Sequence, residues 1–365
     1  MHLVRHSLTI LIGLFILTGC ANLIGRSALH PPMLDFQLLP TAEYQRIGYQ
    51  SATYCPDGQP CLAYSVAPAY DNQGREIWAD AADSWAQQAP LETEAMEVRL
   101  RFWPYAEKTA ADRSRRTAMR YEIELDTTRG SDQVELLLDG AVPKATRGTY
   151  ILIHGFRTNK ESLFFVAESM RFAGFDVVLV DLYGHGNSEG AFTFSGKPEA
   201  QAVNQLIEAN NFTGPLHLAG MSMGGTAVSH LASLRDDIES LLLLAPMLEF
   251  VDSFVDAGRA YTRSAHLVPE SSLKKGARYA LNEAGTTQAD TAAVQRVGEL
   301  GIPTLIMGSV EDRITALGRL QELAASDQDI TLHAVQPRTH HGMILWDTDD
   351  FGAWIRWMES NVIEG

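Results

Sequence analysis

Ser222 lies in the segment LHLAGMSMGGTAV (216–228), with a methionine on each side and a glycine beyond each methionine. A serine hydroxyl becomes a nucleophile only when a base removes its proton and when it protrudes toward a substrate carbon. A sharp turn from strand to helix exposes the hydroxyl but crowds the backbone, and Gly220 and Gly224 relieve that crowding because they lack Cβ atoms. An apolar run before the turn and a helix-like run after it supply the context. The pattern predicts a nucleophilic serine.

Short, nearly continuous apolar segments follow one another from Thr149 onward, and most end beside Gly, Pro, Asp or Ser. These segments are TYILIHGF (149–156), FDVVLVDL (175–182), LHLAGMS (216–222), IESLLLLAP (238–246), PTLIMGS (303–309) and ITLHAVQ (330–336). Helix-like stretches lie between most of them, which is typical of a parallel sheet covered by helices on both faces.

Two earlier segments, MEVRLRF (96–102) and MRYEIELD (119–126), alternate strictly between apolar and polar residues. Period-two alternation predicts strands that are buried on one face only. We therefore expect an α/β fold with a mostly parallel central sheet, to which this pair adds an antiparallel N-terminal edge.

These segments resemble the α/β-hydrolase superfamily, in its monoglyceride-lipase, lysophospholipase and serine-aminopeptidase branch. GMSMGG (220–225) resembles the nucleophile elbow, ILIHGFRTNKES (151–162) resembles the oxyanion loop, and VVLVDLYGHGNSEG (177–190) resembles the D-x-x-G-H-G-x-S segment. The resemblance covers roughly Thr149 to the C-terminus and implies the α/β-hydrolase fold. Met221 departs from it, because the branch usually has histidine there; we expect an effect on the acyl pocket and not on the chemistry.

The resemblance implies that a catalytic acid and then a histidine follow the nucleophile in the chain. Asp312 follows the strand in PTLIMGSVEDRI (303–314) and resembles the family acid, although Gly308 lies one residue further back than the family often shows. Glu311 is a weaker rival, and Glu249 and Asp252, after the preceding strand, are outsiders. An aspartate at a strand end can also serve only as a helix cap.

The base is expected in the loop PRTHHGMILWD (337–347), which holds the adjacent histidines His340 and His341. His333 lies inside the preceding strand and not at its edge. In the resembling family a short apolar stretch directly follows the catalytic histidine, and GMILWD after His341 fits that register better. We therefore expect His341 to contact the nucleophile and the acid, and His340 to face outward or brace the loop.

The resemblance also implies that the backbone N–H groups of Phe156 and Met223 bind the oxyanion. His154 and His185 do not follow the acid in the chain, so we expect both to anchor loops. No His/Cys/Asp cluster has metal-ligand spacing and no glycine-rich phosphate loop opens a helix, so neither a metal nor an organic cofactor is expected.

Residues 247–300 separate two strands by more than an ordinary crossover needs. The apolar residues at helical spacing in this interval are Met247, Phe250, Val251, Phe254 and Val255. We expect a small helical cap insertion there, between the two parts of a hydrolase domain at 91–246 and 301–365; surface helices without a functional role are the alternative.

Residues 1–19 have a basic start and an apolar run from Leu8 to Leu17, a signal-peptide pattern that is shorter than the roughly 20 residues of a membrane-spanning helix. Their end, with Cys20, reads LTGC and resembles the lipobox of bacterial lipoproteins, which predicts a lipidated Cys20; ordinary secretion is the alternative. Because Ala21 is not the aspartate that retains lipoproteins at the inner membrane, the resemblance favours the outer membrane, facing the periplasm.

Residues 20–90 are expected to form a tether and an N-terminal extension. Within them, Cys55 and Cys61 flank a Pro-Asp-Gly turn and are expected to form a disulfide, with a metal site as the alternative. The formal net charge of −16 and the lack of a Lys/Arg stripe argue against a nucleic-acid partner.

Together these features predict a membrane-tethered serine hydrolase that cleaves carboxylic esters, small or lipid-derived, through a Ser-Asp-His triad and an acyl-enzyme. A monoacylglycerol or lysophospholipid is the expected kind of lipid substrate. A peptidase or amidase of the same fold would use the same groups, and a binding lipoprotein that has lost activity is the alternative from another class, because fold does not fix function.

Overall fold

The computed structural model describes residues 22–87, 90–95, 98–108, 117–127, 130–212 and 214–363. The expected signal peptide and Cys20 lie outside the described residues, and so do Met96 and Glu97 of the first alternating segment. Among the helices of these described ranges, none has the length and apolar character needed to cross a bilayer.

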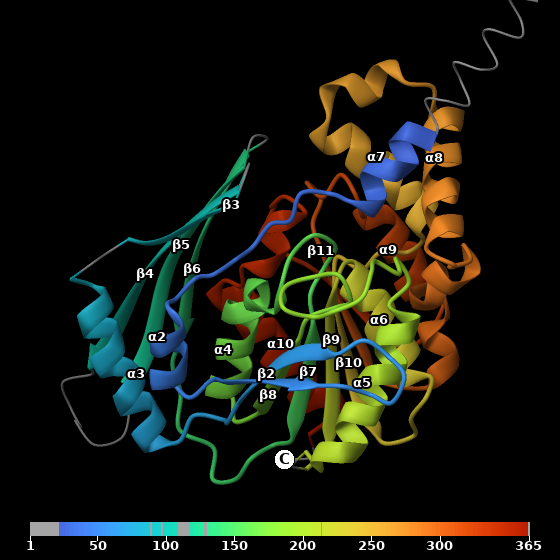
Figure 1. Ribbon diagram of the computed structural model, residues 1–365. Helices are drawn as coiled ribbons and strands as arrows, with labels where there is room; N and C mark the ends of the chain where they lie inside the picture. The colour runs from blue at the N-terminus through green and yellow to red at the C-terminus, as the bar shows by residue number, and fades with distance from the viewer. Residues whose placement is uncertain are drawn as a thin grey trace, which may run out of the picture.

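A central sheet of eight strands has the order β1-β2-β8-β7-β9-β10-β11-β12 (Figure 1). The strands are β1 (Gln50–Tyr54), β2 (Leu62–Ala67), β7 (Thr149–Ile153), β8 (Asp176–Val180), β9 (Leu216–Met221), β10 (Ile238–Leu244), β11 (Thr304–Gly308) and β12 (Ile330–Ala334). β1 and β2 pair antiparallel, β2 is antiparallel to β8, and the pairs from β8 to β12 are parallel. The expected fold class, a mostly parallel sheet with an antiparallel N-terminal pair, is confirmed.

Apolar side chains of the central strands alternate between two clusters, one on each face of the sheet. In β7, Tyr150 and Leu152 belong to the cluster with α4 and α10, whereas Ile151 and Ile153 belong to the cluster with α5 and α6. Strands buried on both faces read as continuous apolar runs, which explains the sequence pattern. The helices that flank the central sheet are α4 (Phe164–Phe172), α5 (Lys197–Asn210), α6 (Met223–Ala232), α9 (Leu317–Ala325) and α10 (Thr348–Asn361).

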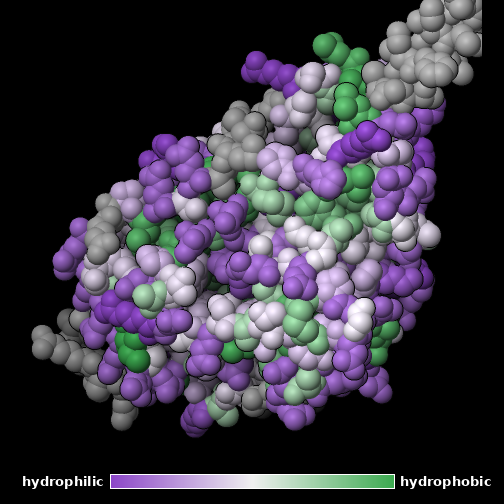
Figure 2. Space-filling view, in the orientation of Figure 1, coloured by the Kyte–Doolittle hydropathy of each residue, from purple (hydrophilic) through white to green (hydrophobic). Residues whose placement is uncertain are grey.

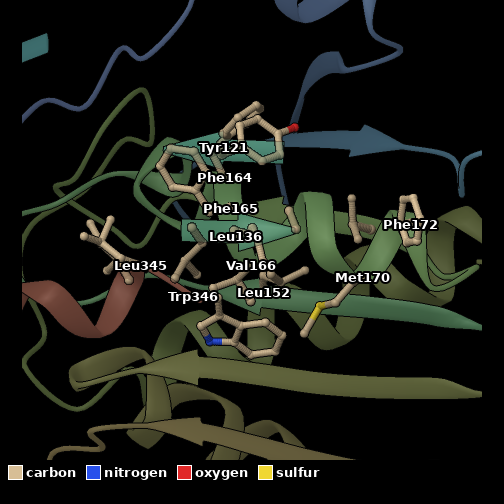
Figure 3. Packing of buried hydrophobic residues seen from close by; sticks show 14 of the residues in the cluster. Tyr121, Leu136, Leu152, Phe164, Phe165, Val166, Met170, Phe172, Leu345 and Trp346 are labelled. Atoms are coloured by element: carbon tan, nitrogen blue, oxygen red, sulfur yellow. The ribbon is translucent and has the colours of Figure 1, made fainter. Parts of the chain in front are cut away.

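The two alternating segments belong to a separate sheet, so their expected place at the edge of the central sheet is wrong. This second sheet is antiparallel, with the order β3-β4-β5-β6. Its strands are β3 (Leu91–Ala95), β4 (Val98–Lys108), β5 (Thr117–Thr127) and β6 (Gly130–Leu138). Its apolar face packs against α4, with the rings of Phe102 and Phe165 5.4 Å apart, as the neighbourhood of Tyr121, Phe164 and Phe165 in Figure 3 shows.

The antiparallel pair of the central sheet comes instead from the N-terminal extension. Besides β1 and β2, this region forms α2 (Thr41–Arg46) and α3 (Asn72–Trp85). A disulfide joins Cys55 to Cys61 between the two strands. The residues of β1 are exposed or half-buried, so no apolar pattern marks that strand in the sequence.

A buried carboxylate holds these parts of the chain together. Glu168 of α4 accepts hydrogen bonds from the hydroxyls of Tyr49, Tyr70 and Tyr121 at 2.7–3.1 Å and from Arg171 at 2.8 Å. A buried charge is tolerated when it is paired and its oxygens are hydrogen-bonded. This network therefore joins the N-terminal extension and the second sheet to α4.

The interval 247–300 is helical and lies at one end of the molecule, where α7 and α8 are labelled in Figure 1. It consists of α7 (Phe250–Tyr261), the 3-10 turn η2 (Arg263–Leu267), α8 (Glu270–Glu283) and the 3-10 segment η3 (Ala289–Leu300). Phe250 is buried and its ring lies 4.6 Å from that of Phe194. The apolar face of α7 thus packs on the core beside the central sheet.

Candidate active site

Ser222 lies at the turn between β9 and α6, with φ 52° and ψ −116°. Residues with side chains rarely adopt such a positive φ, so the surrounding structure must hold it. The Ser222 N–H donates to the carbonyl of Leu244 at 2.9 Å, and its carbonyl accepts from the N–H groups of Gly225 and Met247 at 2.9 and 3.0 Å. These bonds to β10 and to the chain after it fix the exposed turn.

The two glycines expected at this turn allow the backbone to pack closely. A Cβ atom at Gly220 would overlap the carbonyl of Gly224, and one at Gly224 would overlap the carbonyls of Ile153 and His154. Alanine at either position would therefore push α6 away from β9 or β7. The strand-turn-helix geometry predicted from G-x-S-x-G is present.

His340 links Ser222 to Asp312. Its Nε2 lies 3.0 Å from Ser222 Oγ, and its Nδ1 lies 2.7 Å from Asp312 Oδ2. The other carboxylate oxygen, Oδ1, accepts from the backbone N–H groups of Ile314 and Thr315 at 2.8 and 2.9 Å. Asp312 thereby holds its own turn and orients the imidazole, and its side chain is fully buried.

The structure places His340 in this position, so the expected choice of His341 is wrong. A 3-10 turn, η4 (His341–Ile344), begins directly after His340, and it directs the two side chains differently. The His341 ring packs against that of Tyr261 of α7 at a tilt of 40°, with centroids 4.8 Å apart. Burial, followed by the nearby His340 and Arg157, lowers the pKa of His341 to about 3, so this ring is neutral.

The segment before His340 is held by ionic contacts that the sequence did not reveal. Arg338 pairs with Asp347 at 2.7 Å and with Asp350 at 2.8 Å, both at the start of α10, and also bonds the carbonyl of Leu345. Its backbone N–H donates to the Ser309 hydroxyl at 2.9 Å. These contacts tie the histidine loop to the last helix and to the end of β11.

The oxyanion loop approaches the nucleophile closely at Gly155. A Cβ atom there would lie 2.9 Å from Met221 Sδ and 3.3 Å from Ser222 Cβ. Met223 is the first residue of α6, where a backbone N–H has no carbonyl one turn earlier to bond. Phe156 follows Gly155, and its ring packs against those of Phe192 and Phe194.

His154 and His185 lie beside this loop and are buried. Nδ1 of His154 bonds the carbonyl of Gly155 at 2.7 Å, and Nε2 accepts from the N–H of Leu182 at 3.0 Å. His185 Nδ1 bonds the carbonyl of Tyr183 at 2.9 Å. Burial lowers the pKa of each imidazole to about 3, so both are neutral and their contacts are those of loop anchors.

The N-terminal residues 32–36 lie along the same loop. Arg157 has φ 68°; its carbonyl accepts from the N–H of Leu34 at 2.7 Å, and its Nε donates to the carbonyl of Pro32 at 2.8 Å. The side-chain oxygen Oδ1 of Asn159 accepts from the Phe36 N–H at 3.2 Å. Sequence reasoning treated this segment as a tether and missed its contact with the site.

A cavity of about 290 Å³ opens beside His340, between the end of α7 and the two catalytic loops. It is lined by Ala260, Tyr261, Val310, Glu311, Arg313, Thr339 and His340. Glu311, the rival to Asp312, is exposed at this cavity and does not bond the imidazole. Among the described residues, no group of three or more His, Cys, Asp and Glu side chains is arranged to hold a metal.

Two curated proteins are similar to part of this chain. Over 97 residues, Lipase 3 of Moraxella sp. (strain TA144) is 34% identical and Lipase 1 of Psychrobacter immobilis is 32% identical. Each match covers 26% of this chain and 30% of the relative, so the chain spans less than a third of the length of these relatives.

Among solved structures, an esterase of Pyrococcus furiosus is 14% identical, with a TM-score of 0.48 over 72% of this chain and 92% of that chain. A membrane phospholipase A, described as a bacterial virulence factor, is 16% identical, with a TM-score of 0.48 over 98% of both chains. Residues 144–283 match the family Hydrolase_4, described as serine aminopeptidase, S33. This match covers less than half of the chain but includes the oxyanion loop and the turn at Ser222, so this segment is similar to the S33 serine aminopeptidases.

Proposed function

We propose that the protein is a serine hydrolase that cleaves carboxylic esters through an acyl-enzyme on Ser222. The observation that carries the proposal is the continuous hydrogen-bonded chain from Ser222 Oγ through His340 to Asp312. A nucleophile, a base within hydrogen-bonding reach and a carboxylate that orients the base are the groups acyl transfer requires.

In the acylation step, Nε2 of His340 takes the proton of Ser222 while Oγ bonds to the acyl carbon and the carbonyl electron pair moves onto oxygen. The carbonyl then reforms, the bond to the leaving alcohol breaks, and that alcohol takes the proton from Nε2. Asp312 stabilises the imidazolium that forms in between. The products are an acyl-enzyme and a free alcohol.

Deacylation repeats these steps with water. Nε2 takes a proton from water while the water oxygen bonds to the acyl carbon. The Ser222 Oγ–carbon bond then breaks, and the serine recovers its proton from His340 as the carboxylic acid leaves. The N–H groups of Met223 and Phe156 are our candidates for stabilising the oxyanion in both steps, because one begins a helix and the other follows the closely packed Gly155.

A lipid-derived ester is the substrate we favour. Phe156 of the oxyanion loop belongs to a chain of aromatic rings that continues through Phe194 and Phe250 into α7, with neighbouring centroids 5.7 and 4.6 Å apart. Phe194 and Phe250 are buried and support the half-buried Phe156. An apolar side chain on the oxyanion loop favours acyl chains, by roughly 0.8 kcal/mol for each buried CH₂. The two similar curated proteins are named lipases, which supports the same choice.

A lipid anchor on Cys20 would bring the cap to the membrane, in the outer membrane on the periplasmic side. Residues 22–29 are helical and contact α8 so closely that a Cβ at Gly25 would lie 2.6 Å from the Gly276 carbonyl oxygen. Leu267, at the end of η2, is 86% exposed, and Figure 2 shows hydrophobic residues at this end of the molecule.

We expect Cys20→Ser to move the protein out of the membrane fraction or to leave it unprocessed. Wild-type protein that is soluble and unlabelled by palmitate analogues would exclude the anchor.

The test of the proposed function compares wild type with Ser222→Ala on p-nitrophenyl esters of graded chain length, lysophospholipids and aminoacyl amides. Hydrolysis of the esters together with fluorophosphonate labelling, both lost in Ser222→Ala, is the expected result. Preferential cleavage of the amides would instead identify a peptidase or amidase. A folded wild-type protein that neither hydrolyses nor reacts with the probe would indicate a binding lipoprotein.

A further inference from the structure

The last strand of the second sheet carries a carboxylate on its inner face. Positions 132, 134, 136 and 138 of β6 point inward, and three of them are Val134, Leu136 and Leu138. Asp132 takes the fourth position and is 7% exposed. A buried carboxylate is costly unless hydrogen-bond donors satisfy it, so its partners must account for its presence.

Those partners belong to the residue directly before His340. Asp132 Oδ1 accepts from the backbone N–H of Thr339 at 3.1 Å, and Oδ2 accepts from the Thr339 hydroxyl at 2.5 Å. The Thr339 hydroxyl oxygen in turn accepts from the N–H of Gly342 at 3.2 Å. A Cβ at Gly342 would overlap the Asp132 carboxylate, so glycine is needed for this close approach.

These bonds fix both ends of the turn that carries the two histidines. Thr339 is held on its backbone and its side chain, and Gly342 is bonded to Thr339, so His340 lies within a closed ring of contacts. Asp132 also acts on Tyr261, which lines the cavity beside His340. Burial raises the pKa of Tyr261 above its ordinary value, and the charges of Asp312 and Asp132 raise it further.

We infer that Asp132 is a positioning residue for His340, and that the second sheet thereby completes the active site. The carboxylate bonds Thr339, and through it sets the direction in which the next residue presents its imidazole to Ser222. The family match begins at residue 144, so this group comes from outside the matched segment. The inference rests on the proposed function for its kinetic consequence, but its geometric consequence is independent of any substrate.

The kinetic test uses Thr339→Val, which removes the hydroxyl but keeps the shape, beside Thr339→Ser, which keeps the hydroxyl. Because small misplacements of a catalytic group cost up to about a hundredfold, we expect Thr339→Val and Asp132→Asn to lower kcat about 10- to 100-fold while KM changes less than about threefold. Thr339→Ser should stay within about twofold of wild type. Since Thr339 tests the contact from the other side, the inference remains testable if the Asp132 variant does not fold.

Thr348→Val is the matched control. Thr348 also joins β6 to the core, accepting from the Leu137 N–H at 2.9 Å and donating to the Glu135 carbonyl at 3.2 Å, and both of these bonds go to β6 and not to Thr339 or His340. Its variant should keep wild-type kcat. Equal losses of kcat in Thr348→Val and Thr339→Val would show that any weakening of the second sheet lowers activity, which would overturn the inference. An unchanged kcat in Thr339→Val would overturn it as well.

A substrate-free measurement separates this inference from the proposed function. The downfield proton resonance of the His340–Asp312 hydrogen bond should be sharp in wild type and Thr339→Ser and broadened or lost in Thr339→Val and Asp132→Asn. If that pattern is found in a protein without esterase activity, the positioning role stands and the proposed function fails. If the enzyme is active and the resonance is the same in all four proteins, the positioning role fails alone.

Discussion

Replacing Asp312 by asparagine should move the imidazole proton of His340 from Nδ1 to Nε2. The shape of the site stays nearly the same, because one carboxylate oxygen is exchanged for an NH₂ group. Oδ1 of Asp312 accepts two backbone N–H groups, those of Ile314 and Thr315, at 2.8 and 2.9 Å. An amide nitrogen cannot accept from either, so the asparagine must keep its oxygen at that position. Its NH₂ group then faces Nδ1 of His340, where Oδ2 was.

That orientation selects the wrong tautomer. Nδ1 must now accept a hydrogen bond, so the imidazole proton moves to Nε2, which can no longer take the proton of Ser222. An aspartate-to-asparagine change that leaves geometry intact but fixes the wrong tautomer lowers kcat about 10⁴-fold in the well-characterised serine proteases, and we expect a loss of about that size here. KM should change little, because the substrate contacts are unaffected.

Steady-state hydrolysis of a short p-nitrophenyl ester measures this effect, with Glu311→Gln as the matched control. Glu311 is the exposed neighbour and has no bond to the imidazole, so its variant should lose less than about threefold in kcat. A folded Asp312→Asn enzyme that keeps more than about a tenth of kcat would contradict the tautomer argument, and so would equal losses in the two variants.

Three further predictions concern stability. Glu168→Gln leaves Arg171 buried without its carboxylate, so the free energy of unfolding in urea should fall by about 3 kcal/mol or more; an unchanged midpoint would show that the network is not stabilising. His154 and His185 have pKa values of about 3 in the folded protein and about 6.5 in the unfolded chain, so only the unfolded state gains protons between these pH values. The free energy of unfolding should therefore fall as the pH is lowered from 6.5 toward 3, by up to about 1.4 kcal/mol per pH unit for each histidine. His154→Gln should make this fall less steep, and a flat profile in wild type would contradict the assignment. Phe250→Asp buries a charge at a position that is 4% exposed, so it should lower thermal stability and activity alike for all ester chain lengths, and a loss confined to long chains would show that Phe250 lines the acyl site.

Local patterns predicted the nucleophile and its surroundings, because the requirements at Ser222 are local. A strand, a glycine on either side and the start of a following helix lie within 13 consecutive residues, 216–228, and the structure has that strand-turn-helix geometry. The acid came instead from the resemblance to the family, in which it follows a strand of the same sheet, and Asp312 does lie shortly after β11.

The choice between His340 and His341 failed because distant contacts decide it. The register of the apolar stretch favoured His341, but the turn is held by Arg338, which bonds the start of α10, and by Asp132, which lies 207 residues earlier in the chain than Thr339. Which of two neighbouring loop residues points inward depends on these bonds, and no pattern within the loop contains them.

The strand pair at the sheet edge failed for a related reason. Alternation showed that the segments around Leu100 and Ile123 are each buried on one face, which is correct. Alternation does not show which sheet such a strand joins. β1, the actual edge strand of the central sheet, is mostly exposed and has no apolar pattern. Edge strands with polar residues are difficult to recognise from sequence because little burial constrains them.

The central claim, that His340 is the base acting on Ser222, is tested most directly by kcat of His340→Ala beside His341→Ala on one ester, with folding of both variants checked by circular dichroism. His340→Ala should lose about a thousandfold or more, the scale expected when a triad loses its base. His341→Ala should lose less than about tenfold, since that ring contacts Tyr261 and not the nucleophile. A thousandfold loss in His341→Ala with a nearly active His340→Ala would contradict the account.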